Sequence, residues 1–299
     1  MTASFPGIPL VESPIFESAL PAAGLTEAET AIARSLHEFG YALIDFPDPD
    51  IIHRSNRIRA RLEPICGIDA VDSATVKRPP VRRIQDAWRF DDDVRSIAAN
   101  PSVLKLLSKL YGRRAFPFQT LNFPVGTKQP VHTDIVHFSS IPERFMCGVW
   151  LAMEDIHPDS GPLCYVPGSH QWPTMSNILV GRRGWKQKLD SAQSPYQSAW
   201  ASLIAEHQAP VEEFIARKGQ AFIWCANLLH GGSVRRDPSR TRWSQVTHYY
   251  FDDCVYYSPA YSDEALGRLA IRKIVDVTDG TEKPSAYLGR KIGSWMPWR

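Results

Sequence analysis

The amino-acid sequence predicts a mainly β protein with flanking helices, in which a helical part precedes a jelly-roll or cupin-like barrel. Helical spacing of apolar residues is concentrated in the first third of the chain, up to about residue 112. From Phe116 onward, short apolar runs are separated by Pro and Gly, which is typical of antiparallel strands and their turns. Strands and helices do not alternate as they do in a parallel α/β sheet.

The length of the chain favours a single domain. With 299 residues and 43% hydrophobic content it can bury a sizeable core, and one domain of this size is ordinary for a barrel that carries helices. We therefore expect one domain over residues 1–299. Its expected parts are a helical region over about 1–112, a barrel core over about 113–255 with an insertion over about 174–210, and a C-terminal extension over 256–299.

The charge balance argues against polyanionic partners. Lys and Arg total 34 and Asp and Glu total 32, which leaves a formal net charge of +2. Proteins that bind nucleic acid or a membrane surface usually carry a larger or more clustered basic excess. We therefore expect no nucleic-acid and no membrane partner and favour a small-molecule substrate. Whether the chain forms a homo-oligomer stays open at this stage.

Cysteine usage and the lack of export signals favour the cytoplasm. The five cysteines are an odd number without the paired spacing of a zinc site, which is typical of reduced, buried thiols. The first 20 residues contain no basic region followed by an apolar stretch, and no segment approaches the roughly 20 apolar residues of a membrane helix. We expect a cytoplasmic protein.

The helical part opens with a defined start signal. Thr26 and Glu29 have the spacing of a capping box, apolar residues follow at helical intervals, and Gly40 ends the run. The further elements expected in this part are a strand at Tyr41–Phe46 and helices over about Asp50–Cys66 and Asp93–Tyr111.

The barrel part is expected to contain short strands bounded by Pro and Gly. They are Phe118–Phe123, Val131–Asp134, Phe145–Met153, Leu163–Val166, Val211–Ala216, Ala221–Cys225 and Trp243–Phe251. The insertion over 174–210 has no strand pattern, and it combines a basic loop at 181–188 with a candidate helix at Tyr196–His207. Insertions of this length are usually functional lids or disordered segments. The basic and Trp side chains of this insertion either bind a substrate, or they only pack within a lid and carry solvated charge.

One short motif has the chemistry of a metal site. His132 and Asp134 are two positions apart, and on a strand that spacing places both side chains on one face. His230 lies far along the chain, where a returning strand could bring it beside them. Any single His on an apolar strand is more often a core residue. Two His and one carboxylate on one face of an octahedron, however, are the ligand set of non-haem Fe(II) oxygenases.

A buried cation would complete such a site. Arg242 follows His230 by twelve positions (242 − 230 = 12). A dicarboxylate that chelates iron at one end needs a cation at the other, and a guanidinium group suits a carboxylate. Ser244 lies on the same strand face and could add a hydrogen bond. Without the three candidate ligands, Arg242 would be taken for an ordinary surface arginine.

The sequence resembles the phytanoyl-CoA dioxygenase-like family of Fe(II)/2-oxoglutarate-dependent oxygenases. The likeness extends from about Tyr41 to Phe251. Its most specific stretch is residues 146–170, with the sequence MCGVWLAMEDIHPDSGPLCYVPGSH. This matches the family signature W-x-A-x-x-D, N/S-G-P-L and P-G-S-H. The resemblance implies a double-stranded β-helix fold, with His132, Asp134 and His230 as iron ligands.

The resemblance also implies residues that hold the cosubstrate. Arg242 matches the anchor for the remote carboxylate of 2-oxoglutarate, and Trp150 matches a position that packs against it. Arg83, in the sequence Arg-Ile-Gln-Asp, and Gln119 match pocket positions more loosely. Gly232 departs from the family, because relatives often have Ser two residues after the second iron histidine.

The activity that the resemblance implies is oxidation, above all hydroxylation, of a C–H bond in a small metabolite, with Fe(II) as cofactor. 2-Oxoglutarate and O₂ are consumed, and succinate and CO₂ are formed. Related halogenases lack the carboxylate found at Asp134, which favours oxidation. A role in natural product biosynthesis is expected. Two alternatives stay open: a cupin-type isomerase or epimerase that uses a metal as Lewis acid, which leaves Arg242 without a task, and a non-catalytic small-molecule-binding barrel.

Overall fold

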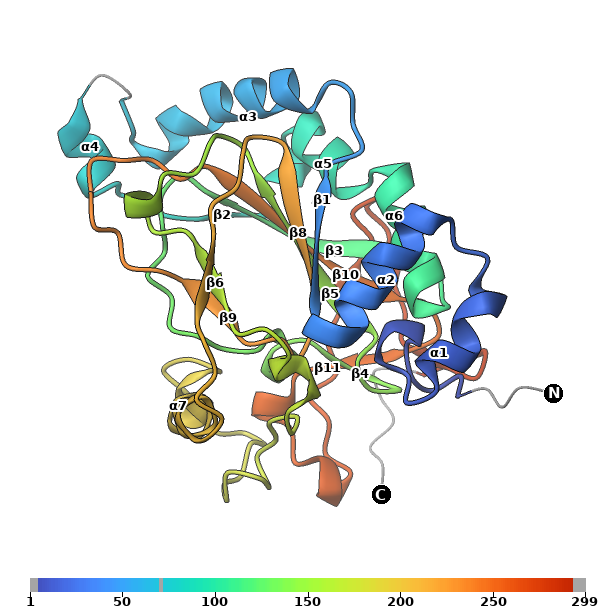
Figure 1. The fold of residues 1–299 in the computed structure, drawn as a ribbon. Helices are drawn as coiled ribbons and strands as arrows, with labels where there is room; N and C mark the ends of the chain where they lie inside the picture. Colours follow the sequence, from blue (N-terminus) through green and yellow to red (C-terminus); the bar gives the residue numbers. More distant parts are fainter. Residues whose placement is uncertain (1–4, 70–71, 293–299) are drawn as a thin grey trace.

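The computed structural model describes residues 5–69 and 72–292. Over these residues the protein is mainly β with helices on the outside (Figure 1), as the sequence predicts. The ends of the expected domain, residues 1–4 and 293–299, lie outside the described part. Among the described helices, none combines the length and apolar character needed to cross a bilayer.

The largest sheet has six antiparallel strands in the order β1-β8-β5-β10-β3-β2. In that order their bounds are Tyr41–Asp45, Gln220–Cys225, Met146–Ala152, Ser244–Phe251, Ala115–Phe123 and Ile84–Gln85. Strands far apart in sequence are therefore neighbours, as β8 and β5 are. We call this the major sheet.

A second sheet of three strands has the order β7-β6-β9, with bounds Glu212–Phe214, Leu163–Tyr165 and His230–Gly232. We call it the minor sheet. The remaining strands form two-stranded pairs. They are β4 (Ser139–Ile141) with β11 (Val255–Tyr257), β12 (Ile274–Val275) with β13 (Glu282–Lys283), and β14 (Ala286–Tyr287) with β15 (Arg290–Lys291).

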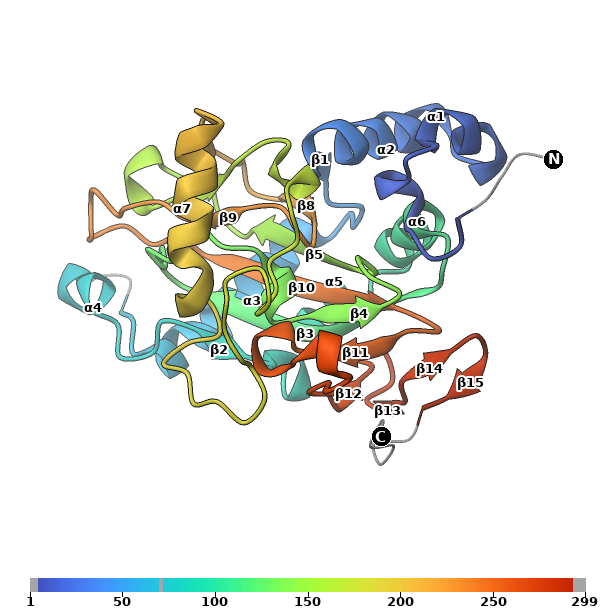
Figure 2. The same ribbon diagram turned by 90° about the horizontal axis from the view of Figure 1, so that it is seen from below.

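Over residues 5–69 and 72–292, seven α-helices flank these sheets. They are α1 (Phe16–Ala19), α2 (Glu27–Phe39), α3 (Ile51–Cys66), α4 (Ser73–Lys77), α5 (Asp92–Ala98), α6 (Pro101–Tyr111) and α7 (Gln197–Glu206). Helices α2, α5 and α6 contact the major sheet and lie on its side away from β6 and β9 (Figure 1). Figures 1 and 2 both place α7 at the β9 end of the molecule, opposite α1 and α2.

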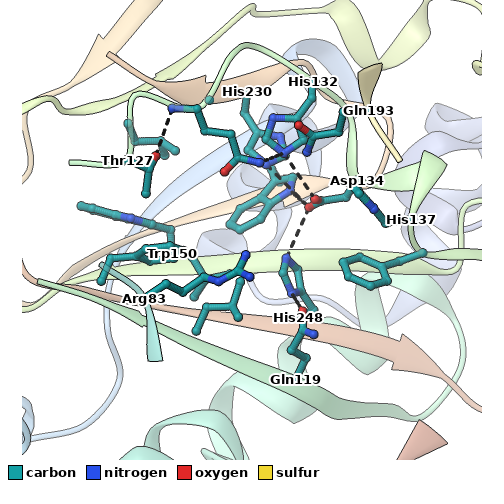
Figure 3. Close-up of a pocket in the computed structure, with 18 of the residues that line it drawn as sticks. Arg83, Gln119, Thr127, His132, Asp134, His137, Trp150, Gln193, His230 and His248 are labelled. Carbon is teal, nitrogen blue, oxygen red and sulfur yellow. Dashed lines mark hydrogen bonds and ion pairs between the residues drawn. The ribbon is translucent and has the colours of Figure 1, made fainter. Parts of the chain in front are cut away.

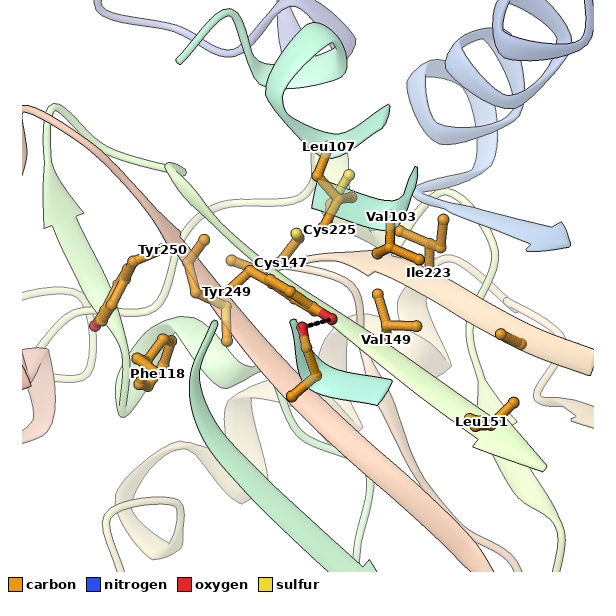
Figure 4. Packing of buried hydrophobic residues seen from close by; sticks show 14 of the residues in the cluster. Val103, Leu107, Phe118, Cys147, Val149, Leu151, Ile223, Cys225, Tyr249 and Tyr250 are labelled. Carbon is orange, nitrogen blue, oxygen red and sulfur yellow. Dashed lines mark hydrogen bonds between the residues drawn. The ribbon is translucent and has the colours of Figure 1, made fainter. Parts of the chain in front are cut away.

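Alternation along the strands divides the core in two. Cys147, Val149 and Leu151 of β5 face the helices and pack near Val103 and Leu107 of α6 (Figure 4). On the opposite face of β5, Trp150 and Ala152 belong to a second apolar cluster with residues of the minor sheet. A strand with period-two alternation and both faces covered is apolar throughout. This is why β5 is buried along its whole length.

Most predicted elements are confirmed. Thr26 and Glu29 form the capping box of α2, whose end is Gly40 in the left-handed region. The insertion contains α7 close to its predicted bounds. Strand β3 begins three residues earlier than predicted. The short helices α1 and α4 and the short strands β2, β4, β9, β11 and β12–β15 were not predicted. The strand predicted at Val131–Asp134 is wrong, for a reason that concerns the site.

Candidate metal centre

His132, Asp134 and His230 come together in the space between the two sheets. They can offer ligand atoms that all lie within 4.8 Å of one another, and all three side chains are buried (Figure 3). The three residues predicted from spacing and resemblance are therefore neighbours in the structure. Their chemistry, two imidazole nitrogens and one carboxylate oxygen, is that of a divalent transition-metal site.

The local backbone differs from the prediction. His132 forms one isolated bridge with His230, through two N–H···O hydrogen bonds of 2.9 Å, and the chain does not continue as a strand. Asp134 instead begins a 3₁₀ turn, Asp134–Val136. The backbone carbonyl of Asp134 accepts hydrogen bonds from the backbone N–H groups of His137 and Phe138. The carboxylate faces the histidines because the turn reorients it. The same-face argument from strand alternation was therefore wrong, although the convergence that it predicted is present.

Each histidine is oriented by a backbone carbonyl two residues before it. Nδ1 of His132 lies 2.9 Å from Pro130 O, and Nδ1 of His230 lies 3.0 Å from Leu228 O. A carbonyl can only accept, so each Nδ1 carries a proton, and Nε2 is the nitrogen that each histidine can offer to a metal. The Nε2 atoms lie 3.8 and 3.6 Å from the carboxylate of Asp134. Burial, reinforced by the neighbouring His230, lowers the pKa of His132 to about 3. The imidazole of His132 is therefore neutral, as a metal ligand must be.

The carboxylate of Asp134 is held from two sides. Burial opposes its ionisation, but the imidazoles of His230 and His248 outweigh burial and place its pKa well below the usual range. Nε1–H of Trp224 donates to Oδ2 at 2.8 Å, and Nε2 of His248 lies 3.5 Å from the same oxygen. His248 stands where the register of β10 shifts against β3, a kind of irregularity that often re-aims a side chain near a functional site.

Replacing Trp224 by Phe should weaken metal binding while leaving the fold intact. The change keeps an aromatic ring and removes the donor to Asp134, and loss of such an outer-shell hydrogen bond typically costs about 10- to 100-fold in metal affinity. Titration of the purified variant with Fe(II) or Mn(II) under anaerobic conditions measures the effect. Trp200→Phe is the matched control, because Trp200 is also buried and its Nε1 has no hydrogen-bond partner in the described part of the chain. Equal metal affinity in the wild type and Trp224→Phe would contradict the role.

Gly148 makes room for the indole of Trp224. The two residues are cross-strand partners in β5 and β8, and a Cβ atom on Gly148 would lie 2.0 Å from Cζ2 of Trp224. Gly148→Ala should lower the free energy of unfolding by about 1–3 kcal/mol, the usual cost of overpacking, measured by urea denaturation. Adding Trp224→Phe should relieve part of the loss. Gly7→Ala, where the nearest atom is 3.8 Å away, should stay within about 0.5 kcal/mol of the wild type.

A cavity of about 300 Å³ adjoins the three residues. Four further residues predicted for the site line it: Arg83, Gln119, Trp150 and Arg242. Ser244 is fully buried and its Oγ has no hydrogen-bond partner among the described residues, but it is not part of the cavity lining. Its contact with a cosubstrate remains a prediction.

Arg242 is a buried cation without a carboxylate partner among the described residues. Its side chain is 3% exposed, its Nε has no hydrogen-bond partner, and its guanidinium lies 5.6 Å from the ring centroid of Trp150. Burial lowers the pKa of Arg242 to about 10, an effect that Glu154 partly opposes, so the group is charged at neutral pH. An unpaired buried charge is costly. The cavity therefore fits a ligand that brings an anionic group to Arg242, and a dicarboxylate such as 2-oxoglutarate meets this requirement.

The prediction missed several residues around the cavity. Gln129 lies with its Nε2 3.2 Å from Nε2 of His132 and must turn aside for a ligand to bind there. Gln119 accepts from His248 at 3.0 Å, and His137 and Gln193 also line the cavity. The signal for His248 was present, because it shares the strand face of Arg242. Trp172, Trp185 and Trp200 do not line it.

Several solved structures of iron- and 2-oxoglutarate-dependent enzymes have a similar fold. The carbocyclase SnoK from nogalamycin biosynthesis matches with a TM-score of 0.59 and 17% identity over 85% of this chain and 95% of its own. The epimerase SnoN, in complex with Fe³⁺, α-ketoglutarate and nogalamycin RO, matches with 0.57 and 18% over 77% and 86%. EctD from S. alaskensis, with 2-oxoglutarate and 5-hydroxyectoine, matches with 0.56 and 16% over 79% and 79%. The fold is that of Fe/2-oxoglutarate-dependent enzymes.

The family follows from the sequence comparison. The family model for phytanoyl-CoA dioxygenase (PhyH) matches residues 31–241, and the chain belongs to this family. The peroxisomal phytanoyl-CoA dioxygenase of Rattus norvegicus is 24% identical over 60% of this chain, and a probable phytanoyl-CoA dioxygenase of Caenorhabditis elegans is 24% identical over 73%. The chain matches 52% of the length of the rat enzyme and 74% of that of the nematode protein. Family and site together support an enzyme of the Fe/2-oxoglutarate oxygenase type.

Proposed function

We propose that the protein is an Fe(II)/2-oxoglutarate-dependent dioxygenase that hydroxylates a C–H bond of a small metabolite. The observation that carries the proposal is the buried guanidinium of Arg242, which has no carboxylate partner among the described residues and lines the same cavity as the His132, Asp134 and His230 cluster. A metal site alone fits many functions. A metal site next to a buried cation is suited to an enzyme that binds a chelating dicarboxylate. We further propose that the facing sheets form one double-stranded β-helix domain.

The three proposed iron ligands are prepared for a divalent metal. His132 and His230 each offer Nε2, because each Nδ1 is held by a backbone carbonyl, and the carboxylate of Asp134 is fixed by Trp224. Two nitrogens and one oxygen on one face of an octahedron leave three positions open for a bidentate cosubstrate and O₂. The carboxylate at Asp134 occupies the position that halogenases keep free for chloride, which supports oxidation by oxygen.

The cosubstrate site is proposed around Arg242. Its guanidinium would bind the remote carboxylate of 2-oxoglutarate, and Trp150 would pack along the carbon chain. Bound together, iron, 2-oxoglutarate and O₂ supply the oxidising equivalent that breaks a C–H bond, with succinate and CO₂ as co-products. The protein orients these groups and excludes water from them. Arg83 and Gln119 line the same cavity and are proposed as further contacts to bound small molecules.

Hydroxylation is the proposed reaction, although the similar folds include an epimerase and a carbocyclase. All of these reactions would use the same ligands and the same arginine. A metal-dependent isomerase without 2-oxoglutarate is the second candidate, but it gives Arg242 no task. A non-catalytic binding barrel is opposed by the complete ligand set. Because two of the similar structures come from nogalamycin biosynthesis, we also propose a role in natural product biosynthesis for this protein.

Anaerobic titration of the Fe(II)-loaded protein with 2-oxoglutarate tests the proposal. We expect the weak visible metal-to-ligand charge-transfer band of the chelate, and we expect Asp134→Ala to lose it. Release of succinate on admission of O₂ would then establish the oxygenase. If the wild type binds iron and shows neither the band nor affinity for 2-oxoglutarate, the metal-dependent isomerase becomes the better hypothesis.

A further inference from the structure

The cavity has two chemically different ends. The apolar side chains near Arg242 all belong to one buried cluster: Leu121, Phe123, Trp150, Leu163 and Val246. The other end is lined by amides and imidazoles: Gln119, Gln193, His137 and His248, with Phe138 among them. Figure 3 shows Gln193 and His137 next to Asp134, with Trp150 on the opposite side of the view. If 2-oxoglutarate occupies the apolar end, as proposed above, the polar end is left for the substrate.

Gln193 is the residue that points most directly to a ligand. It is 8% exposed and lines the cavity beside His132 and Asp134 (Figure 3). Its side-chain amide has no hydrogen-bond partner among the described residues, and only its backbone carbonyl is used, by the N–H of Tyr196 at 2.9 Å. The amide faces the cavity, where it can hydrogen-bond a ligand. A ligand without a hydrogen-bonding group at this place would bury the amide unpaired, which costs about 1–3 kcal/mol.

The segment that carries Gln193 is anchored to the rest of the protein. The hydroxyl of Tyr196 donates to Oδ1 of Asn177 at 2.9 Å, and Nδ2 of Asn177 donates to the carbonyl of Ser262 at 2.6 Å. The backbone N–H of Gly184 donates to Asp263 at 2.6 Å. The insertion over 174–210 is therefore tied to residues after β11, and it presents the amide of Gln193 at a fixed place beside the metal centre.

We propose that the substrate is a compact polar molecule whose hydroxyl, amide or carboxylate group is bound by Gln193 next to the C–H bond that is oxidised. This inference rests on the proposed function and specifies its substrate class. A hydrocarbon would bury the amide of Gln193 without a partner, and sites built to hydrogen-bond a substrate strongly reject analogues without the bonding group. At about 300 Å³ for both ligands, the cavity is at the low end of the roughly 300–1,000 Å³ range of small-molecule sites.

The experiment compares two panels of compounds on the Fe(II)- and 2-oxoglutarate-loaded protein under anaerobic conditions. The polar panel contains amino acids, small hydroxy acids, monosaccharides and nucleosides. The apolar panel contains fatty acids, terpene alcohols and a steroid. The readout is the shift of the charge-transfer band when a substrate binds, followed by succinate release on admission of O₂. We expect responses in the polar panel only.

Gln193→Met then tests the assigned residue, because it keeps the length of the side chain and removes its hydrogen-bonding atoms. We expect the affinity for the responding polar compound to fall by roughly 5- to 150-fold, the equivalent of about 1–3 kcal/mol, with unchanged affinity for 2-oxoglutarate. Gln187→Met, an exposed glutamine in the same insertion, is the matched control and should change neither affinity. Gln193→Asn, which withdraws the amide by one methylene, is the second variant and should also weaken binding of the polar compound.

The outcomes separate the two proposals. If the band with 2-oxoglutarate never forms, the oxygenase proposal fails before any substrate is added. If the band forms but no polar compound shifts it, or if an apolar compound binds equally well to the wild type and Gln193→Met, the substrate class is wrong and the oxygenase stands. Unchanged binding of a polar substrate by both Gln193 variants would overturn the role of this residue.

Discussion

Arg242→Ala is expected to abolish useful binding of 2-oxoglutarate while iron binding is retained. The variant leaves the remote carboxylate of the cosubstrate without a partner in an apolar end of the cavity. Truncating one member of such a buried charge pair costs about 2–5 kcal/mol, or roughly 30-fold to several thousand-fold in affinity. Arg242→Lys should lose less, because it keeps the charge but not the bidentate geometry. Anaerobic titration of the charge-transfer band measures both variants.

Arg240→Ala is the control for this prediction. Arg240 is close in sequence, but its side chain is 44% exposed and pairs with Asp237 at 3.0 Å. Its removal should leave the affinity for 2-oxoglutarate unchanged. If Arg242→Ala binds 2-oxoglutarate like the wild type and Arg240→Ala does not, the anchor has been assigned to the wrong arginine.

Asp134→Ala is expected to remove iron binding and all iron-dependent turnover. The carboxylate is the anionic member of the proposed ligand set, and its loss also leaves the indole N–H of Trp224 without its acceptor. Loss of a ligand should exceed the 10- to 100-fold effect typical of an outer-shell partner. Iron retained after anaerobic loading and gel filtration, determined colorimetrically, measures binding directly.

Asp190→Ala serves as the matched control, since this carboxylate is exposed and lies in the insertion away from the cluster. It should retain iron like the wild type. Circular dichroism of Asp134→Ala distinguishes a lost ligand from a lost fold. Full iron content and turnover in a folded Asp134→Ala would remove the metal-centre assignment.

Local rules predicted most of the secondary structure. The helix α2 follows from its capping box and Gly40, and the central strands β5, β8 and β10 follow from apolar runs bounded by turn residues. Local rules could not predict the order of the strands in space, because β5 and β8 pair across more than 60 intervening residues. Short strands such as β4 and β11 were missed for a related reason. Such short segments are strands only because a partner lies beside them.

The sequence predicted which residues form the candidate site but not which groups hold them in place. Spacing and resemblance together selected His132, Asp134 and His230. The groups that orient the histidines are backbone carbonyls, of Pro130 and Leu228, which carry no sequence signature. The 3₁₀ turn at Asp134 was mistaken for a strand continuation because the turn forms only where the chain leaves its bridge with His230.

Gln193 could not have been found from the sequence. It lies in the insertion between β6 and β7, whose length and path no local pattern fixes, and a lone glutamine resembles any solvated residue. Its significance arises from the tertiary anchors of Asn177 and Tyr196, which hold the segment over the cavity.

The backbone pair between His132 and His230 has a consequence for the life of the protein in a cell. It joins positions 98 residues apart (230 − 132 = 98) at the metal centre. An ion bound by both side chains, as proposed, would join these two positions in the folded chain only, and at a free concentration of about 100 times its Kd it would stabilise the fold by about 2.7 kcal/mol. Ligands that bind only the folded state shift the folding equilibrium toward it. Iron supply would then set how long the chain survives proteolysis as well as how fast it works.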